Sequence, residues 1–425
     1  LASVYRDTTF TATSGKFTSK EEGEQAFQTI EGKPFTVTKV EKKEGKEQPP
    51  QLYDLTSLQV DCNRKFGFSA EMPLNVIQSL YEKKYTTYPR VDTQYLSDDI
   101  YPKCPPIMNG LFQTKFGGVA PYAPLIRPIG GKPLRKSKRV FDTSKVTDHH
   151  AIIPTGVIPN TLNEAEQRVF DLVARRFIAA FLPDCKYSTT TVLGKVAPQS
   201  SPGGDTNVLS DDSVEFKATG KEILDPGWRV VNNKDHKTED DETNVAPSGA
   251  EGGAEVTLPA FVKGESGEHQ PTLTEKWTTP PPYYTEATLL RAMETAGKFV
   301  EDETLRAAMK ENGIGRPSSR ASIIETLFKR HYIRRERKRL VATPTGIELI
   351  GLIREELLKS CELTGIWEKK LRDIEARKYE PQLFIDELKQ MVTDIVFSVL
   401  QDNTPRQITV AAEKVSPSRN NKTRK

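Results

Sequence analysis

A tyrosine and an arginine two positions apart are the residues of this sequence that could carry out phosphoryl chemistry. Tyr88 and Arg90 lie in the stretch Tyr85 to Tyr95, which reads Tyr-Thr-Thr-Tyr-Pro-Arg-Val-Asp-Thr-Gln-Tyr. Pro89 prevents a helix from continuing here, so we expect an extended segment in which side chains two positions apart point to the same side. The phenol of Tyr88 would attack phosphorus, and the guanidinium of Arg90 would hold the attacked group through two hydrogen bonds.

A helix is expected directly before this segment. Apolar residues between Leu74 and Lys84 fall at helical spacing, at positions 74, 77, 80 and 81. Such a helix would fix the start of the extended segment. Tyrosines beside prolines are more often packing residues in turns, so the local residues alone leave a structural role for Tyr88 open.

Four segments, in order along the chain, resemble the motifs of the type IA DNA topoisomerases. Thr-Tyr-Pro-Arg-Val-Asp, around Tyr88, is similar to the active-site signature of that family. The other matching segments are Tyr53–Gln59 with Asn63–Ala70, Thr147–Thr155, and Pro281–Ala287 with Gly313–Ile324. The His-His-Ala-Ile-Ile-Pro-Thr stretch and the lack of a four-cysteine metal module favour the bacterial topoisomerase III branch.

The resemblance implies an isomerase that cleaves single-stranded DNA reversibly. Tyr88 would form a 5′-phosphotyrosine link, a strand would pass, and the break would be resealed without ATP because one ester replaces another. The enzyme would relax negative supercoils or decatenate. Ionising a tyrosine phenol at pH 7 costs roughly 4 kcal/mol in water, and Arg90 would lower that cost and neutralise charge on the phosphate. His149 matches the family's histidine near the scissile phosphate and can donate a hydrogen bond in either charge state; His150 is expected to be structural.

Further residues are expected to bind DNA. Gly313 to Ser319 looks like a loop that enters a helix, where backbone NH groups, hydroxyls and Arg316 could hold a phosphate. The predicted DNA-binding residues are Gln59, Arg64, Arg316, Ser318, Ser319 and Arg320. Many relatives have Thr-Tyr where this chain has Ser319-Arg320, so the role of that tyrosine is not carried over. Lys329 to Arg339 holds seven Lys or Arg against one acid, which indicates either phosphate contact or a solvated helix end.

The resemblance places the metal site outside this sequence. In the family, Mg²⁺ and the acid–base carboxylates belong to a Toprim domain that precedes the matched region, and this chain has no Asp-x-Asp-x-Asp pattern. We therefore expect a fragment that starts within a strand, lacks the Toprim domain, binds no metal, binds single-stranded DNA weakly, and is inactive or poorly active alone. The acids Glu239 to Glu242 are expected to be solvated.

Composition is that of a soluble multi-domain protein. Of 425 residues, 36% are hydrophobic and 28% charged, and the net charge of +3 is too small to indicate nucleic acid by itself. The four cysteines are far apart and show no zinc spacing. We expect a cytoplasmic, nucleoid-associated bacterial monomer with reduced thiols, no membrane contact, and a DNA helicase as a further partner in the cell.

The pattern of elements predicts a multi-domain α+β fold, part of the type IA torus. A β-rich gate or hinge domain would be interrupted by a helical domain that carries the tyrosine and followed by a mostly helical, winged-helix-like base domain. The predicted divisions are 1–50 and 184–280 for the gate, 51–183 for the helical domain, 281–402 for the base domain, and 403–425 for a disordered basic tail.

Several local predictions accompany this division. Strands are expected at 8–13, 35–40, 189–193, 213–218, 228–231 and 254–258, and surface loops at 199–205 and 232–253. A helix is expected at 162–182, one from a Thr285 cap to Gly297, and one from about Ser318; a hairpin at 332–341 and a helix capped by Thr345 and Glu348 should follow. The apolar stripe from Leu383 to Val399 is expected to be core packing.

Two other classes of function stay open. The chain could be a noncatalytic module that binds single-stranded nucleic acid, with Tyr88 structural. It could also be another enzyme with a tyrosine nucleophile, but the Arg-His-Arg set of a tyrosine recombinase and the histidine-rich metal cluster of a relaxase are not visible. A covalent DNA adduct that is lost in Tyr88→Phe would separate these hypotheses.

Overall fold

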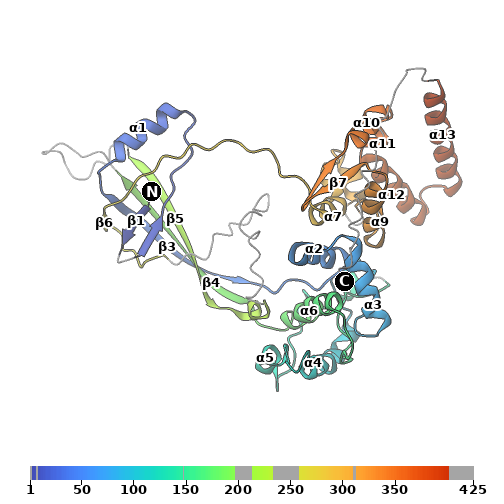
Figure 1. The fold of residues 1–425 in the computed structure, drawn as a ribbon, viewed down its shortest axis with the longest axis horizontal. Helices are drawn as coiled ribbons and strands as arrows, with labels where there is room; N and C mark the ends of the chain where they lie inside the picture. Colours follow the sequence, from blue (N-terminus) through green and yellow to red (C-terminus); the bar gives the residue numbers. More distant parts are fainter. Residues whose placement is uncertain are drawn as a thin grey trace, which may run out of the picture. The chain divides into compact units, whose positions relative to one another are not determined.

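The computed structural model describes residues 2–5, 8–146, 148–196, 213–232, 258–309 and 313–401. These residues form two compact units (Figure 1). The first comprises 1–50, 128–135 and 178–280, and the second 51–127, 136–177 and 281–425. The predicted tail at 403–425, the loop at 199–205, and nearly all of the loop at 232–253 and the strand at 254–258 lie outside the described residues.

The first unit is built around an antiparallel sheet. Its strand order is β5-β4-β3-β6, and β1 and β2 pair separately. Figure 1 shows β3, β4 and β5 as a long, curved ribbon. The elements are β1 (Ala2–Tyr5), β2 (Thr8–Thr11), α1 (Lys20–Ile30), β3 (Phe35–Glu47), β4 (Cys185–Val196), β5 (Val214–Asp225), the 3₁₀ turn η4 (Gly227–Val231) and β6 (Ser266–Gly267).

Aromatic side chains fill the core of this unit. Phe35 and Val37 are buried on β3, as the two-residue period of a strand with one covered face requires. The rings of Phe10 and Phe261 pack edge to face with centroids 4.8 Å apart. A Cβ atom at Gly194 would overlap the ring of Phe35. The ring therefore packs directly against the backbone of β4 at a position that has no side chain.

One predicted strand of this unit is wrong. Residues 228–231 form part of the 3₁₀ turn η4 rather than a strand. Pro226 and Gly227, whose φ is +48°, start this turn. The indole of Trp228 donates to the carbonyl of Glu47 (3.0 Å), so this ring fastens the turn to β3. The strands predicted around 35–40, 189–193 and 213–218 are confirmed and are longer than expected.

The second unit is mostly helical. Three helices meet in its core, where Val60, Ala287, Leu290, Met293 and Ile324 are buried together. Its helices are α2 (Leu55–Phe66), α3 (Glu71–Glu82), α4 (Cys104–Gln113), α5 (Ala123–Ile126), α6 (Glu164–Ala179, which runs into the first unit at its last residues), α7 (Glu286–Glu294), α8 (Glu303–Met309), α9 (Pro317–Lys329), α10 (Pro344–Leu352), α11 (Glu356–Lys359), α12 (Glu362–Glu375) and α13 (Pro381–Leu400). Short 3₁₀ turns lie at Asp98–Lys103, Arg127–Ile129, Thr143–Lys145 and Ala296–Phe299, and the strands are β7 (Ile333–Glu336) and β8 (Arg339–Ala342).

The order of α9, hairpin and α10 agrees with the prediction, whereas two helix ends differ. Thr285 caps α7 through a capping box with Thr288, but α7 ends at Glu294, because the chain tightens into a 3₁₀ turn before Gly297. The cap of α10 is Thr343 rather than Thr345. Its hydroxyl accepts a hydrogen bond from the N–H of Gly346 (3.1 Å) and leaves Pro344 as the first helical residue.

The apolar stripe of α13 does not pack into a core, contrary to the prediction. None of its residues is buried in the structure described, and Val399 is 67% exposed. In Figure 1 this helix stands at the edge of its unit. Its periodicity correctly predicted a helix, since period depends only on local spacing, but burial requires a partner surface.

The predicted helical domain at 51–183 and base domain at 281–402 lie largely within the same compact unit. Helix α2 packs on α7 and α9 there, so the two sequence regions share a core. Their treatment as separate domains stays a prediction. Among the helices that the structure describes, none combines the length and apolarity needed to cross a bilayer.

Candidate functional site

Three of the motifs singled out in the sequence lie side by side in the second unit. The extended segment from Tyr85 to Tyr95 is flanked by the residues before α2 and by the segment from Ala151 to Thr155. The N–H of Leu55 donates to the carbonyl of Val91 (3.1 Å) on one side, and the N–H of Thr87 donates to Ile153 (2.9 Å) on the other. These bonds replace a regular sheet and fix the backbone around position 88.

The ring of Tyr88 contacts two other aromatic rings. Its ring centroid is 4.3 Å from that of His149, with planes tilted by 35°. The ring of Tyr81, in the last turn of α3, meets it edge to face at 5.5 Å. Tyr88 is partly exposed and His149 exposed, so this pair is accessible to a ligand.

The contact between Tyr88 and His149 depends on a second set of backbone bonds. The N–H of Ala151 donates to Tyr95 (2.9 Å), and the hydroxyl of Thr93 donates to the carbonyl of Lys145 (2.7 Å). These bonds hold the chain on both sides of His149 against the extended segment. His150 is half-buried, its Nδ1 lies 2.8 Å from the carbonyl of Ala151, and burial lowers its pKa. His150 is thus held by its own backbone, in agreement with a structural role.

Arg90 is exposed, and the structure shows no hydrogen bond or ion pair between it and another described residue. Pro89, between Tyr88 and Arg90, is buried and anchors this part of the segment. A guanidinium without a carboxylate partner is available to bind an anion.

The end of α3 fixes the position of Tyr85, the first residue of the extended segment. Lys84 adopts a left-handed φ of +63°, and the N–H of Tyr85 returns to the carbonyl of Leu80 (2.9 Å). The hydroxyl of Thr155 donates to the carbonyl of Lys84 (2.6 Å). The turn from helix to extended segment is therefore held from both sides.

A buried carboxylate joins α3 to α6 at the same place. Glu166 accepts hydrogen bonds from the hydroxyl of Ser79 (2.7 Å) and from the ammonium of Lys83 (2.6 Å). It also accepts from the N–H of Asn163 (2.9 Å), whose side chain accepts from the N–H of Glu166 in return. Burial raises the pKa of Glu166, but these hydrogen bonds and the charge of Lys83 outweigh it and hold the pKa below its usual value.

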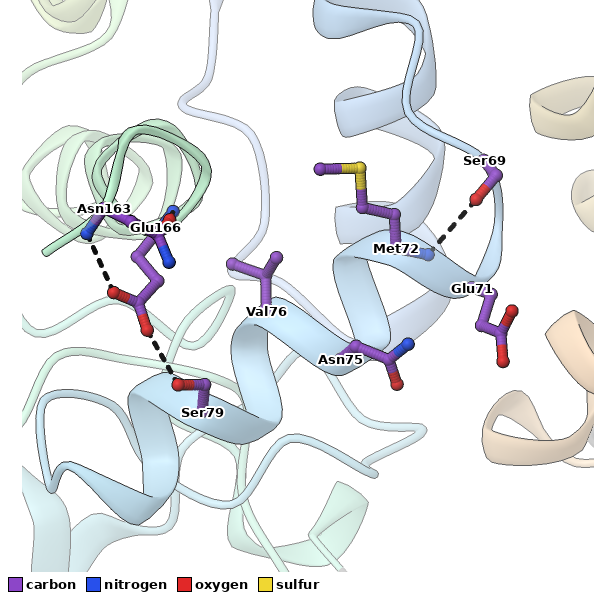
Figure 2. A pocket seen from close by; sticks show the side chains of 8 residues that line it. All are labelled: Ser69, Glu71, Met72, Asn75, Val76, Ser79, Asn163 and Glu166. Atoms are coloured by element: carbon purple, nitrogen blue, oxygen red, sulfur yellow. Dashed lines mark hydrogen bonds between the residues drawn. The ribbon is translucent and has the colours of Figure 1, made fainter. Parts of the chain in front are cut away.

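An open groove of about 340 Å³ lies beside this carboxylate, and its lining side chains are drawn in Figure 2. Its sides are formed by α3 and the start of α6, and its lining includes Met72, Asn75 and Val76. Tyr88, Arg90 and His149 do not line it. Because the hydrogen bonds of Glu166 are directed at Ser79, Lys83 and Asn163, we assign this carboxylate to holding α3 rather than to binding a ligand.

Two of the predicted DNA-binding residues are interior. Gln59 is fully buried, and its amide nitrogen donates to the carbonyl of Ala70 (2.7 Å). Arg320 is 2% exposed and donates to the hydroxyl of Thr56 (2.8 Å) and the carbonyl of Ile314 (3.2 Å). Burial lowers its pKa. These side chains have no exposed surface through which to contact DNA in this structure, so the expectation of direct contact is corrected. Gln59 holds α2 to the start of α3, and Arg320 holds α9 and its preceding loop to α2.

The other four predicted residues are accessible. Arg64 in the last turn of α2 and Arg316 at the start of α9 are exposed, as is Ser319, and Ser318 is partly exposed. Arg316 occupies the N-cap position with its side chain unused for capping. The loop before it has left-handed φ angles at Gly313 and Gly315, a conformation that glycine adopts without strain.

The basic run divides into a structural and an exposed part. Arg335 donates to Glu286 (2.7 Å) and Glu325 (2.7 Å), and its guanidinium lies over the ring of Phe328. Glu286 in turn accepts from the N–H of Ala70 (2.7 Å). Arg335 therefore fixes the hairpin to the rest of the second unit. This role is neither the phosphate contact nor the solvated helix end that the sequence suggested for Lys329 to Arg339.

No group of three or more His, Cys, Asp or Glu residues within the described ranges is placed to hold a metal ion. The residues present there do not fit a Mg²⁺ centre. The location of the Mg²⁺ site in a Toprim domain stays a prediction.

Sequence reasoning missed Tyr81 and Glu166. Tyr81 counted only as a member of an apolar stripe, yet it is 39% exposed and packs on Tyr88. Its place in the last turn of the helix before the extended segment was the one available signal. Glu166 gave no signal, because its partners Ser79 and Lys83 are more than 80 positions away.

Comparison with known proteins identifies the family. The sequence model for "DNA topoisomerase" matches residues 4–386. The chain belongs to the DNA topoisomerase family. The DNA topoisomerase 3 of Bacillus thuringiensis (strain Al Hakam) is 37% identical over 377 residues, which cover 86% of this chain and 47% of that protein. The DNA topoisomerase 3 of Bacillus subtilis (strain 168) is 36% identical over 85% of this chain and 46% of its own length.

A solved structure of full-length topoisomerase I from Thermotoga maritima shares the fold of this topoisomerase chain. The matched region comprises 91% of this chain and 56% of the Thermotoga maritima protein, with a TM-score of 0.60 and 22% sequence identity. The predicted resemblance to type IA DNA topoisomerases of the topoisomerase III branch is confirmed. The mixed helix and sheet content is confirmed as well. The chain spans about half the length of the curated relatives that it matches.

Proposed function

We propose that this chain carries the nucleophile and part of the single-strand binding surface of a type IA, topoisomerase III-like DNA topoisomerase. The observation that supports this most directly is the accessible ring pair of Tyr88 and His149 beside an Arg90 that the structure leaves exposed. The full reaction, relaxation or decatenation by strand passage, is proposed for the whole protein, because the chain covers about half of its relatives.

In the proposed cleavage step, the Oη atom of Tyr88 bonds to phosphorus and the bond from phosphorus to the 3′ oxygen breaks. The phenol loses its proton and the departing 3′ oxygen gains one, so a 5′-phosphotyrosine and a free 3′-hydroxyl result. Resealing reverses these changes and needs no ATP, since each step exchanges one phosphate ester for another. Arg90 would neutralise charge on the phosphate oxygens.

His149 is proposed to orient the reacting phosphate. Its imidazole is in ring contact with Tyr88, so a group that it binds by a ring N–H lies near the phenol. An imidazole keeps at least one N–H donor in either charge state. This supports a role as hydrogen-bond donor, while the apposed rings would also limit the rotation of Tyr88.

The strand itself is proposed to run past the start of α9. Arg316, Ser318 and Ser319 lie in the first turn of that helix or just before it and are accessible. Phosphate binding by a helix N-terminus is favoured by its free N–H groups and dipole. Arg64 is proposed as a further phosphate contact. Gln59 and Arg320 are left out of the proposed contact because both side chains are buried.

The finer arrangement also belongs to this proposal. The first unit would be the gate of the torus, and the second would combine the tyrosine-bearing helices with a winged-helix-like base. Mg²⁺ and its carboxylates would be supplied by a Toprim domain, and a helicase would act with the whole protein near the nucleoid. The family relationship supports these assignments without defining them.

The test joins the predicted N-terminal Toprim domain to this chain and incubates the protein with end-labelled single-stranded DNA and Mg²⁺. Denaturation should trap a covalent adduct, and Tyr88→Phe should remove it because the attacking oxygen is lost. Tyr81→Phe is the matched control, since it changes the neighbouring ring in the same way and should keep the adduct. An undiminished adduct in Tyr88→Phe would rule the assignment out and favour the noncatalytic module.

A further inference from the structure

Two exposed tyrosines lie next to the basic hairpin in the second unit. Tyr283 is 60% exposed and Tyr284 is 47% exposed. Their backbone is fixed: the carbonyl of Tyr284 accepts a hydrogen bond from the N–H of Leu340 in β8 (2.7 Å), and Thr285 caps α7 immediately afterwards. The two rings are therefore presented from a defined segment alongside β8.

The hairpin carries two cations that the structure leaves without a described acidic partner. Arg337 at its turn and Arg339 at the start of β8 are exposed, and their guanidinium groups form no hydrogen bond or ion pair with another described residue. In contrast, Arg335 is bound by Glu286 and Glu325, and Arg334 is bound by Glu336 (2.9 Å). The two guanidinium groups without an acidic partner thus lie at the turn and at the start of β8, the strand whose Leu340 is hydrogen-bonded to Tyr284.

We propose that Tyr283 and Tyr284 form a stacking surface for the unpaired bases of single-stranded DNA, with Arg337 and Arg339 binding its phosphates. An exposed phenol ring offers a flat face to any base, and a duplex hides those base faces, so the surface selects single strands. Guanidinium groups beside the rings supply attraction to the backbone that is independent of sequence. The inference rests on the proposed function and specifies which aromatic residues would contact the strand.

Stacking is tested with two labelled strands of equal length, an oligothymidylate and an abasic strand, by fluorescence anisotropy. Tyr283→Leu and Tyr284→Leu should each weaken binding of the oligothymidylate about five- to tenfold, since stacking contributes at the lower end of its usual range on an open surface. Binding of the abasic strand should not change. Tyr283→Phe and Tyr284→Phe should keep the affinity, and Phe299→Leu, which alters a ring that is 63% exposed elsewhere in the unit, is the matched control.

The phosphate contacts are tested by the dependence of binding on salt. Arg337 has a left-handed φ of +57°, so Arg337→Gly removes the charge at a position that suits glycine. This variant and Arg339→Gln should weaken both strands alike and each lower the slope of log affinity against log salt by about 0.7. Arg337→Lys should keep the slope.

The outcomes separate this inference from the proposed function. If the unaltered chain binds the oligothymidylate but the leucine variants bind it equally well, or lose the abasic strand to the same extent, the stacking surface is refuted and DNA binding stands. If the unaltered chain binds neither strand at low salt, both the stacking surface and the DNA-binding part of the proposed function are refuted.

Discussion

The rings of Tyr88 and His149 lie 4.3 Å apart, although the two residues are 61 positions apart in the chain. The contact exists because backbone hydrogen bonds align the segment around Ala151 with the segment from Thr87 to Tyr95. The proposed nucleophile and the proposed hydrogen-bond donor are thereby held on the same accessible surface.

His149→Ala should lower the initial rate of covalent-adduct formation about 10²-fold in the protein that carries the predicted Toprim domain, the usual cost of removing one donor to a reacting oxyanion. The binding of an uncleaved strand should change much less. Quantitative gel analysis of the trapped adduct provides the measurement. His150→Ala is the neighbouring control, and an initial rate of adduct formation in His149→Ala equal to that of the unaltered protein would contradict the role.

Glu166→Gln should lower the free energy of unfolding by about 1–3 kcal/mol at neutral pH, because Lys83 loses a charged acceptor and a buried hydrogen bond is weakened. The pKa of Glu166 is depressed in the folded state, so its contribution is complete above the unfolded pKa, near 4.3. It disappears as the pH falls through the lower, folded value.

Thermal melts of the unaltered chain and Glu166→Gln between pH 7 and pH 3 measure this difference. The two curves should differ most at neutral pH and converge in acid. Glu164, exposed at the start of the same helix, gives the control: Glu164→Gln should change the melting temperature little. A gap between the Glu166→Gln and unaltered curves that widens toward acid would show that the linkage has the opposite sign.

Gln59→Leu tests the correction of a predicted DNA contact. The buried amide donates to Ala70, whereas its oxygen has no hydrogen-bond partner in the structure described. The substitution removes one bond and one unsatisfied buried atom together, so the free energy of unfolding should change by less than about 1 kcal/mol. Affinity for single-stranded DNA should not change, and a tenfold loss of affinity with unchanged stability would return Gln59 to the binding surface.

The four thiols should differ in reactivity. Cys62, Cys104 and Cys185 are buried, whereas Cys361 is partly exposed, and burial raises the pKa of Cys104 to about 12. A thiol reagent at pH 8 should therefore modify Cys361 quickly in the native chain and the three buried cysteines only after denaturation. Cys361→Ser should abolish the fast phase; a fast phase that persists would show that a buried thiol is accessible.

The sequence by itself predicted the helices with a clear apolar period, the strands around 35–40, 189–193 and 213–218, the cap of α7 and the family. Apolar period, proline and glycine positions, and the order of four motifs are local properties that can be read along the chain. Thr285 as a cap and the glycine loop that enters α9 are examples. Where the local signal was ambiguous, as at Trp228 or between Thr343 and Thr345, the prediction was wrong.

Only the tertiary structure decided which motif residues are accessible. Gln59 and Arg320 match a DNA-binding family but are buried, whereas Tyr283 and Tyr284 are exposed beside the hairpin. The apolar stripe of α13 shows the same limit, because its pattern predicted a buried face that the described residues do not cover. Burial and proximity depend on contacts between segments far apart in the chain, and the spacing of residues within one segment carries no information about them.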